Sequence, residues 1–214
     1  MTCTLIFGAR GSLGSHIFHK ASEKSVVHPV SSSSHRQMMY FKNKNEHNLH
    51  NLPKLDVVIW AQGVNVNDSI GSLKDFEYVL EANVTYIARS LDWLVSKDKL
   101  NEGARLCVMS SIWQDIARTD KVSYTVSKAA LGGLVRSVAA DLGPRGIYIN
   151  SVLPGPIDNP MTRQMLTPDQ MAKLPGLVDP DDVWNAIDFL CFTKSCINGQ
   201  SLVLDHGFSV IRNL

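Results

Sequence analysis

The sequence predicts an α/β fold in which a doubly wound parallel sheet lies between two layers of helices. Short apolar runs alternate with longer helical segments along the whole chain, which is the pattern of a parallel sheet with crossover helices. The runs are also apolar at nearly every position, as in VVIW and LCVM. Such runs indicate strands that are covered on both faces. We therefore expect three layers, α/β/α.

The apolar runs give the expected strands and the segments between them give the expected helices. Strands are predicted at residues 4–7, 25–30, 56–60, 105–109, 148–153 and 201–204. Helices are predicted at residues 14–22, 73–98, 123–142 and 179–192. Ser72 and Asp75 resemble a capping box at the start of the second helix. The polar segment 31–54 shows little periodicity, so one helix of the doubly wound pattern is expected to be short or missing there.

Length and charge limit the classes of function. A chain of 214 residues with 44% hydrophobic residues can bury one sizeable core, so we expect a single domain over residues 1–214. The 21 basic and 20 acidic residues are scattered and leave a formal net charge of +1. This balance argues against nucleic acid or an acidic membrane as a partner. A small molecule is the expected partner.

The cysteines and the apolar runs indicate where the protein works. The 4 cysteines are not spaced as paired C-x-x-C ligands, so we expect reduced thiols and no metal site. The sequence shows no secretory leader pattern and no apolar run long enough for a membrane span. We expect a cytoplasmic protein.

A glycine-rich turn follows the first expected strand and leads into a helix. Gly8 permits a tight turn, Gly11 lets the backbone approach a phosphate, and Gly14 lets the helix pack closely on the sheet. Free N–H groups at the start of the helix can then bind phosphate oxygens. The alternative is an ordinary turn. The position directly after the first strand favours a Rossmann-like dinucleotide site.

The residues after the second strand indicate which dinucleotide is bound. An NAD site usually has an acidic residue about 20 positions after the glycines, but no acid occurs from Lys24 to Asn45. Ser32 and Arg36 lie there instead and could hold a 2′-phosphate. Arg10 is a second candidate cation. NADP(H) is therefore expected in preference to NAD(H), the alternative being a solvated loop without a ligand.

A tyrosine and a lysine four residues apart give the chemical signal. Tyr124 and Lys128 fall on one face of an expected helix. A nearby ammonium would lower the pKa of the phenol, which could then exchange a proton with a carbonyl or alcohol oxygen. Ser111 follows the apolar strand before this helix, and Asn83 lies in the preceding helix. The alternatives are an exposed Tyr and Lys, and an Asn83 amide that only bonds a neighbouring strand.

The order of these motifs resembles the short-chain dehydrogenase/reductase family over nearly the whole chain. The similarity is carried, in order, by the glycine turn 8–14, Ala61-Gln62-Gly63, Asn83, Ser110-Ser111, Tyr124 to Lys128, the loop Pro154 to Met161, and Asp205-His206-Gly207. Three positions depart from the family pattern. Trp60 replaces the first amide of an Asn-Asn-Ala-Gly motif, Ser12 replaces a common glycine, and His206 interrupts a usual Asp-Gly-Gly.

The resemblance implies a role for each site residue. Tyr124 would be the general acid/base, and Lys128 would lower its pKa and hold the nicotinamide ribose. Ser111 would bond the reacting oxygen, and Asn83 would anchor a water that relays protons from Lys128. With the cations considered above, the expected cofactor-binding residues are Gly8, Arg10, Gly11, Ser12, Leu13, Gly14, Ser32, Arg36, Ala61, Gln62, Gly63, Asn83, Tyr124, Lys128, Pro154, Gly155, Ile157 and Asn159.

The implied activity is NAD(P)(H)-dependent interconversion of a carbonyl and an alcohol on a small molecule. The alternative is an NADP(H)-binding sensor or scaffold without turnover. The proline-rich stretch 154–180 suits a lid over the substrate. The candidate substrate-pocket residues are Met161, Arg163, Gln164, Met165, Leu166, Met171, Leu174, Trp113 and Gln114. Small residues after Lys128, including Ala129, Ala130 and Gly133, suggest the close helix packing of a homodimer or homotetramer.

Overall fold

The computed structural model describes residues 1–31, 49–73, 75–159, 162–163 and 166–210. At its centre is a six-stranded sheet with the strand order β2-β1-β3-β4-β5-β6. Every neighbouring pair of strands is parallel. The strands are β1 (Cys3–Phe7), β2 (Val26–Val30), β3 (Leu55–Trp60), β4 (Leu100–Met109), β5 (Tyr148–Pro154) and β6 (Ser201–Leu204). The predicted doubly wound α/β fold is confirmed.

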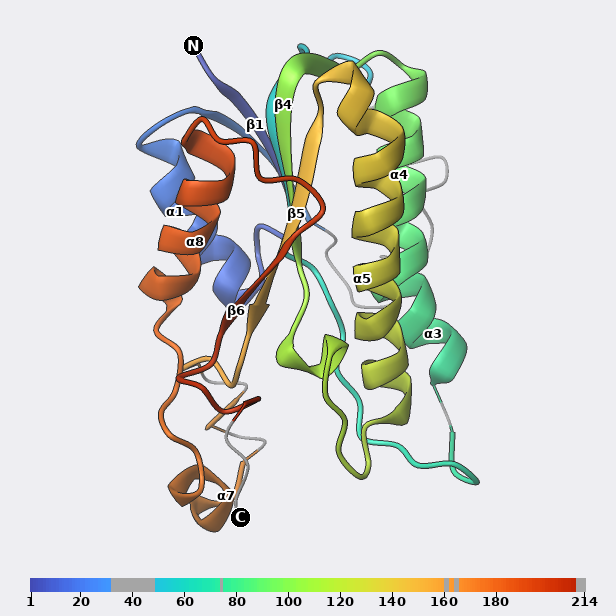
Figure 1. Cartoon of the computed structure of the whole chain (residues 1–214), viewed down its shortest axis with the longest axis vertical. Coiled ribbons are helices and arrows are strands. Elements are labelled where there is room, and N and C mark those ends of the chain that lie inside the picture. Colours follow the sequence, from blue (N-terminus) through green and yellow to red (C-terminus); the bar gives the residue numbers. More distant parts are fainter. Residues whose placement is uncertain (32–48, 74, 160–161, 164–165, 211–214) are drawn as a thin grey trace.

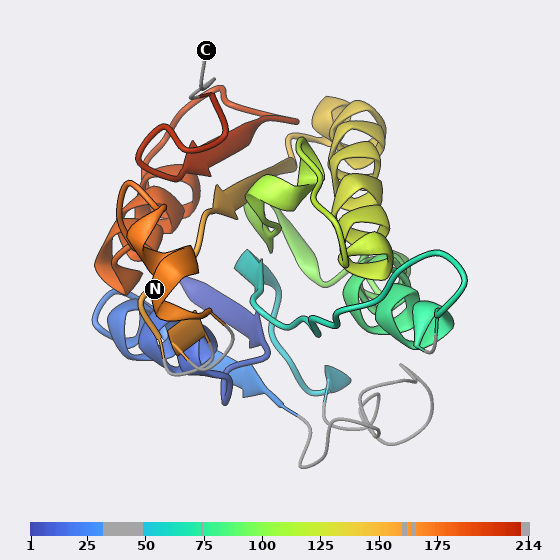
Figure 2. The ribbon, with the colours of Figure 1, turned by 90° about the horizontal axis from the view of Figure 1, so that it is seen from below.

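Helices cover both faces of the sheet (Figures 1 and 2). One face carries α1 (Ser12–Ser22) and α8 (Pro180–Phe192), and the other carries α4 (Tyr86–Ser96) and α5 (Val122–Leu142). Shorter elements lie in the connections: α3 (Phe76–Leu80), the π-helical turn η2 (Glu81–Thr85), the 3₁₀ turns η3 (Ile112–Gln114) and η4 (Gly143–Arg145), and α7 (Pro168–Ala172). None of the helices in the described residues is long and apolar enough to cross a membrane.

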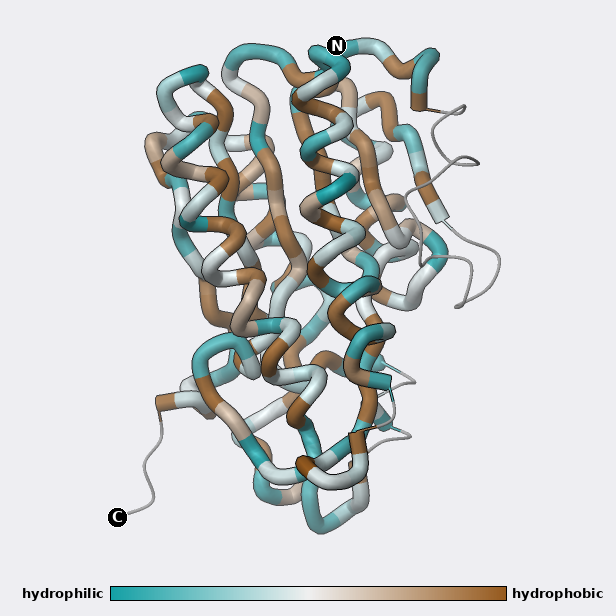
Figure 3. Tube along the Cα trace, turned by 90° about the vertical axis from the view of Figure 1, so that its right-hand side faces the viewer, coloured by the Kyte–Doolittle hydropathy of each residue, from teal (hydrophilic) through white to brown (hydrophobic). Residues whose placement is uncertain are grey.

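The four central strands, β1, β3, β4 and β5, are largely apolar because each contributes buried side chains to two cores. Leu5 and Phe7 of β1 pack in the cluster beneath α4 and α5, whereas Ile6 packs in the cluster beneath α1 and α8. All three side chains are fully buried. Figure 3 shows hydrophobic stretches along the strands and more hydrophilic ones in the loops below them. Burial on both faces removes the alternation that a half-exposed strand would show.

The chain reverses its direction across the sheet between β1 and β3. From β1 it moves outward to β2 at one edge, then crosses back to β3 on the other side of β1. Phe7 and Trp60 are paired at the carboxyl ends of these strands, and the Ala61 N–H donates to the Phe7 carbonyl at 2.9 Å. In open α/β sheets such a switch point leaves a crevice for a ligand. The glycine turn and Gly63 both border it.

Two predictions about local structure need comment. The capping box at Ser72 and Asp75 is wrong: the helix begins at Phe76, Asp75 makes no side-chain cap bond, and the Ser72 hydroxyl donates to the Ser69 carbonyl. A carboxylate one methylene shorter than Glu cannot reach back as that motif requires. The shortened or missing helix was expected in the segment 31–54, most of which, residues 32–48, lies outside the described residues.

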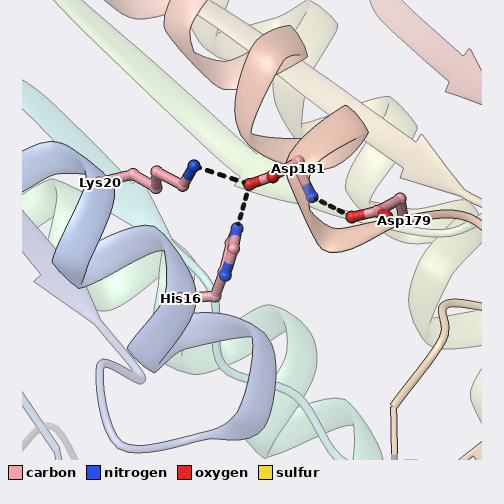
Figure 4. Close-up of polar contacts among 4 residues, drawn as sticks. All are labelled: His16, Lys20, Asp179 and Asp181. Carbon is pink, nitrogen blue, oxygen red and sulfur yellow. Dashed lines mark hydrogen bonds and ion pairs between the residues drawn. The ribbon is translucent and has the colours of Figure 1, made fainter.

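A small cluster of charges joins α1 to α8 (Figure 4). His16 Nε2 and Lys20 Nζ each lie 2.9 Å from Oδ1 of Asp181. Asp179 caps α8 by accepting the Asp181 N–H. These side chains are partly exposed, so the ion pairs that connect the two helices add little stability.

Candidate active site

A cleft of about 690 Å³ lies at the carboxyl ends of the strands. Its walls come from the glycine turn, the chain after β3, the end of β4, the start of α5, the loop after β5, and the α7 segment. Because these segments follow parallel strands, they meet at one edge of the sheet. The cleft therefore sits at the switch point that the topology creates.

Steric crowding shows why the turn needs glycine at two positions. Gly8 has φ +82°, and a Cβ there would lie 2.6 Å from the Gln62 backbone nitrogen. A Cβ on Gly14 would lie 2.0 Å from the Gly8 carbonyl oxygen. Gly14 also lines the cleft, whereas Gly8 does not. Gly8 therefore permits the shape of the turn but does not line the cleft.

The start of α1 is open to an anion. Gly11 is the N-cap, and no side chain caps the helix or places an acid in its first turn. Gly11, Ser12 and Leu13 line the cleft. Unpaired N–H groups at a helix start, with the partial positive charge of the dipole, bind phosphate well.

Of the three residues proposed to bind a 2′-phosphate, the structure describes only Arg10. Arg10 is exposed outside the cleft lining, and its backbone N–H donates to Ser31 Oγ at 3.1 Å. Ser32 and Arg36 lie outside the described residues. The expected preference for NADP(H) therefore stays a prediction.

Two buried polar side chains beside the cleft have no partner among the described residues. Both amide atoms of Gln62 and the hydroxyl of Ser110 are unbonded, although Gln62 is only 6% exposed and Ser110 only 5%. Both residues line the cleft. A buried amide without partners is costly, so these groups fit a ligand that supplies donors and acceptors. The cleft thus suits a dinucleotide, with phosphates at α1 and polar groups deeper inside.

Tyr124, Ser111 and Lys128 meet in this cleft. Lys128 is buried, its Nζ donates to the Met109 carbonyl at 2.9 Å, and it lies 5.6 Å from the centroid of the Tyr124 ring. Ser111 is buried at the end of β4 and caps η3. The predicted face of α5 is therefore correct, since Tyr124 and Lys128 both point toward the end of β4.

Burial governs the ionisation of the pair. It raises the pKa of Tyr124 to about 12, with a hydrogen bond from Ser111 acting in the opposite direction. It also lowers the pKa of Lys128 to about 8. This differs from the expectation that Lys128 lowers the pKa of Tyr124. Lys128 bonds a carbonyl rather than the phenol, so desolvation outweighs its attraction.

Asn83 lies in the middle of the π-helical turn and is fully buried. Its Oδ1 accepts from the Val64 N–H at 2.8 Å, and its Nδ2 donates to the Val64 carbonyl and to Ser127 Oγ, both at 2.9 Å. The amide thus ties the chain after β3 to α5. The partners of Asn83 lie in a loop and a helix, not in the neighbouring strand that the alternative interpretation expected. The proposed water relay stays a prediction. Asn83 itself does not line the cleft.

The loop after β5 forms the opposite wall. Pro154, Gly155, Ile157 and Asn159 all line the cleft, as do Ala61, Gln62 and Gly63 after β3. Asn159 Oδ1 accepts from the Thr162 N–H at 2.9 Å, which occupies the acceptor side of its amide. Its Nδ2 group has no partner among the described residues, so a ligand amide oxygen could bind there.

Only some of the residues that we expected to contact the substrate line the cleft. Trp113, Leu166 and Leu174 line the cleft. Gln114 instead donates to Ser201 Oγ at 3.0 Å, and Arg163 forms a two-bond pair with Asp158. Neither of these two residues lines the cleft, and nor does Met171. Met161, Gln164 and Met165 lie outside the described residues.

Several cleft residues were not expected from the sequence. Sequence reasoning missed Arg118, Lys121, Gln170, Lys173, Phe208 and Ser209. The basic residues just before Tyr124 were a usable signal, because they follow β4 and Ser111, which comes two residues after the end of that strand. Phe208 and Ser209 are placed by Asp205, whose carboxylate accepts from the N–H groups of Gly207 and Ser209. His206 has φ 53°, a conformation that the usual glycine would adopt more easily.

Comparison with known proteins agrees with this geometry. A family model described as enoyl-(acyl carrier protein) reductase matches residues 33–209. The chain belongs to the short-chain dehydrogenase/reductase family. Members of this family are oxidoreductases that use NAD(P), so the recognition made from the order of motifs is confirmed.

Individual relatives cover most of the chain. It is 27% identical to a 3-oxoacyl-(acyl-carrier-protein) reductase FabG of Rickettsia felis, over 93% of this chain and 88% of the relative. It is 31% identical to a glucose 1-dehydrogenase of Gluconobacter oxydans, over 73% of this chain and 63% of the relative. The two named activities act on different compounds. The relatives therefore support an oxidoreductase without fixing its substrate.

Solved structures show the same fold. A short chain dehydrogenase family protein from Francisella tularensis superposes with a TM-score of 0.85 at 18% identity, covering 99% of this chain and 100% of that chain. A short-chain dehydrogenase/reductase from Serratia marcescens gives a TM-score of 0.82 at 20% identity, with 98% of each chain covered. At this level of identity the likeness concerns architecture alone.

Proposed function

We propose that this short-chain dehydrogenase/reductase interconverts a carbonyl and an alcohol on a small molecule, with NAD(P)(H) as cofactor and Tyr124 as the general acid/base. The observation that carries the proposal is the meeting of Tyr124, Ser111 and Lys128 in the cleft at the switch point. The unpartnered amide of Gln62 and the open start of α1 support a dinucleotide beside them.

Each side chain has a role that its surroundings support. When bound, the nicotinamide supplies or accepts the hydride. Tyr124 donates its proton to the carbonyl oxygen in reduction and accepts the proton in oxidation. Ser111, whose hydrogen bond favours tyrosinate, orients the reacting oxygen. Lys128 keeps a charge near the phenol at neutral pH, since its pKa of about 8 still favours the ammonium.

Substitution of Tyr124 tests the catalytic role. Tyr124→Phe removes the proton donor while keeping the ring that packs between Lys121 and Lys128. We expect kcat to fall by at least about a hundredfold with little change in the Kd for the reduced cofactor, measured by fluorescence. Retained turnover in this variant would show that another group transfers the proton.

The preferred cofactor is proposed to be NADP(H). The support is the absence of an acidic residue from Lys24 to Asn45, together with Arg10, Ser32 and Arg36 in the sequence. Comparison of KM for NADPH and NADH decides it, and Arg36→Gln should raise the KM for NADPH alone. A clear preference for NADH in the unaltered protein would contradict this choice.

A sensor or scaffold that binds NADP(H) without turnover is the alternative. It would not require Ser111, Tyr124 and Lys128 to share one cleft, and it predicts cofactor binding with no turnover of any carbonyl. We further propose that residues 1–214 form one domain and that the protein is cytoplasmic. The free thiols of all 4 cysteines support a reducing compartment.

A further inference from the structure

The end of the cleft beside Tyr124 is positively charged. Arg118 and Lys121 line the cleft from the segment before α5, and Lys173 lines the same cleft from the residue that follows α7. Lys128 lies deeper. Among the described residues that line the cleft, every charged side chain is basic, and none is Asp or Glu. A cleft with walls of one charge concentrates ligands of the opposite charge.

Arg118 presents a free hydrogen-bonding edge. Its guanidinium lies over the ring of Trp113, 5.5 Å from the centroid. Within the described part of the chain it forms no hydrogen bond or ion pair. Stacking occupies the face of a guanidinium and leaves its N–H groups in the plane. Those groups match the two oxygens of a carboxylate or phosphate.

Lys121 places further positive charge at the reacting end. Its Nζ lies 5.6 Å from the centroid of the Tyr124 ring, on a buried side chain. Its hydrogen-bond partners are neutral, namely Asn65 Oδ1 at 2.6 Å and the Val66 carbonyl at 3.2 Å. The nearby Asp68 carboxylate bonds the backbone and hydroxyl of Ser123 instead. The charge of Lys121 therefore has no directly bonded counter-ion.

Burial and a second cation both lower the pKa of Lys121. Burial is the main cause that lowers its pKa to about 8, and the charge of Arg118 adds to this, while Asp68 acts in the opposite direction. An anion bound by Arg118 would weaken this repulsion and so stabilise the positive charge of Lys121.

The third cation and the apolar walls complete the arrangement. Lys173 is exposed and directly follows α7, whose start is fixed by a capping box between Thr167 and Gln170. The cleft also has apolar lining residues from the same segments, namely Trp113, Ile116, Leu166, Leu174 and Phe208. Such a site suits a molecule with an apolar body and an anionic end.

We propose that the substrate is an amphipathic oxo compound with a carboxylate or phosphate group, which Arg118 and Lys173 bind while Lys121 holds positive charge beside the carbonyl. This rests on the proposed function, because the carbonyl must reach Tyr124. The phosphates of a dinucleotide are expected at the start of α1, whereas Lys121 contacts Tyr124. The two groups of anion sites therefore lie at different ends of the cleft.

A matched series of compounds tests the proposal. Methyl ketones with four to eight carbons between carbonyl and end group are prepared as the carboxylate, the phosphonate and the methyl ester. Binding to the protein with cofactor present is followed by tryptophan fluorescence, with Trp113→Phe to identify the reporter. Turnover is followed at the absorbance band of the reduced cofactor.

We expect the best anionic compound to exceed its methyl ester by about tenfold or more in both affinity and kcat/KM at low ionic strength. The preference should shrink as salt is added. In Arg118→Gln, the ratio of acid to ester should fall to within about twofold. Arg145→Gln is the matched control, because Arg145 is exposed at the other end of α5, and its ratio should equal that of the unaltered protein.

The outcomes separate this inference from the proposed function. A preference for the carboxylate or for the phosphonate tells which anion the substrate carries. Equal affinity and equal kcat/KM for acids and esters would overturn the inference, even if esters are reduced. The inference would also fail if no anion of the series binds. Tight binding of acids with no turnover of any compound supports the anion site alone and contradicts both the proposed function and the assignment of an anionic substrate.

Discussion

At the scale of single residues, the site brings together groups whose burial favours their neutral forms. The pKa of Tyr124 is raised to about 12, and the pKa values of Lys121 and Lys128 are both lowered to about 8. Proton exchange with a substrate oxygen needs a phenol that is protonated in reduction. The raised pKa of Tyr124 keeps the phenol protonated across the neutral range, so the cofactor-free protein is prepared for the reductive direction.

Burial of Lys128 predicts a pH dependence of stability. The ordinary pKa of lysine is 10.5 and the pKa of Lys128 in the fold is about 8, so between these values the unfolded chain binds more protons. The free energy of unfolding should therefore rise with pH in this window, by up to about 1.4 kcal/mol per pH unit for one lysine. Lys121 contributes in the same direction. Urea unfolding from pH 7.5 to 10 measures the slope.

Removal of the lysine isolates its contribution. Lys128→Met should have a smaller slope than the unaltered protein, while the exposed Lys97, changed to Met, serves as the matched control and should keep the original slope. Equal slopes in all three proteins would mean that Lys128 is not held in a desolvated position.

The positions of residues could be predicted where spacing fixes geometry. Four residues on a helix place Tyr124 and Lys128 on one face, and the order of motifs located Ser111 and Asn83. The same reasoning did not predict that the amide of Gln62 is buried without a hydrogen-bond partner. The burial of a side chain depends on tertiary packing, which spacing along the sequence does not reveal. It also gave the opposite direction for the pKa of Tyr124, since burial cannot be read from spacing.

At the scale of elements, the helix that carries Tyr124 is capped from a distant segment. Lys121, the N-cap of α5, makes no side-chain cap bond. Asp68, from the chain after β3, instead accepts from the Ser123 N–H at 2.9 Å and also from the Ser123 hydroxyl. Both residues are buried. This long-range cap fixes the turn of α5 that bears Tyr124.

Loss of that cap should affect stability and turnover together. Asp68→Ala leaves buried donors of Ser123 unpaired, which should cost about 2 kcal/mol of unfolding free energy. A displaced Tyr124 should lower kcat on the order of tenfold. Asp92→Ala, at an exposed position of α4, is the control for loss of a carboxylate. Unchanged stability and kcat in Asp68→Ala would contradict this role.

Two glycines of the turn between β1 and α1 should respond differently to alanine. Gly14→Ala forces a Cβ to within 2.0 Å of the Gly8 carbonyl, so the protein should be strongly destabilised. At Gly11 the nearest atom is 3.4 Å away and φ is −67°, so Gly11→Ala should fold. Because Gly11 lines the cleft, this variant should weaken cofactor binding.

Thermal unfolding of the Gly14→Ala and Gly11→Ala variants measures the difference in stability, and cofactor titration measures the loss of binding. Similar stability of both variants would contradict the crowding.

The helices and strands could be predicted because their hydrophobic patterns are clear. All six strands were located from their apolar runs. The helix expected at 73–98 was less regular than its pattern, since it begins at Phe76 and contains the π-helical turn around Asn83. Those features follow from tertiary contacts of Asn83 with Val64 and Ser127, which a local pattern does not contain.

At the scale of the whole molecule, one face of α5 remains available for another subunit. Ala129 and Ala130 are exposed, a Cβ on Gly133 would meet nothing within 4 Å, and Val126 is 41% exposed. This supports the homodimer or homotetramer expected from the small residues. Light scattering at micromolar concentration should show an oligomer.

A charge on that face should separate the subunits. Val126→Arg should shift the protein toward the monomer, because an arginine would be buried without a partner in a helix-to-helix interface. Val26→Arg, a change of the same kind at an exposed position of β2, is the control and should keep the oligomer. A monomeric unaltered protein would remove the proposal.

The central proposal is that Tyr124 transfers a proton to or from the substrate in a cleft that also binds a nicotinamide cofactor. The most direct test uses reduced cofactor labelled with deuterium at C4 and the best ketone of the series described above. With the unaltered protein, we predict an alcohol that carries deuterium at the former carbonyl carbon, and with Tyr124→Phe no such product. An unlabelled alcohol, or equal label from the Phe variant, would contradict the central claim.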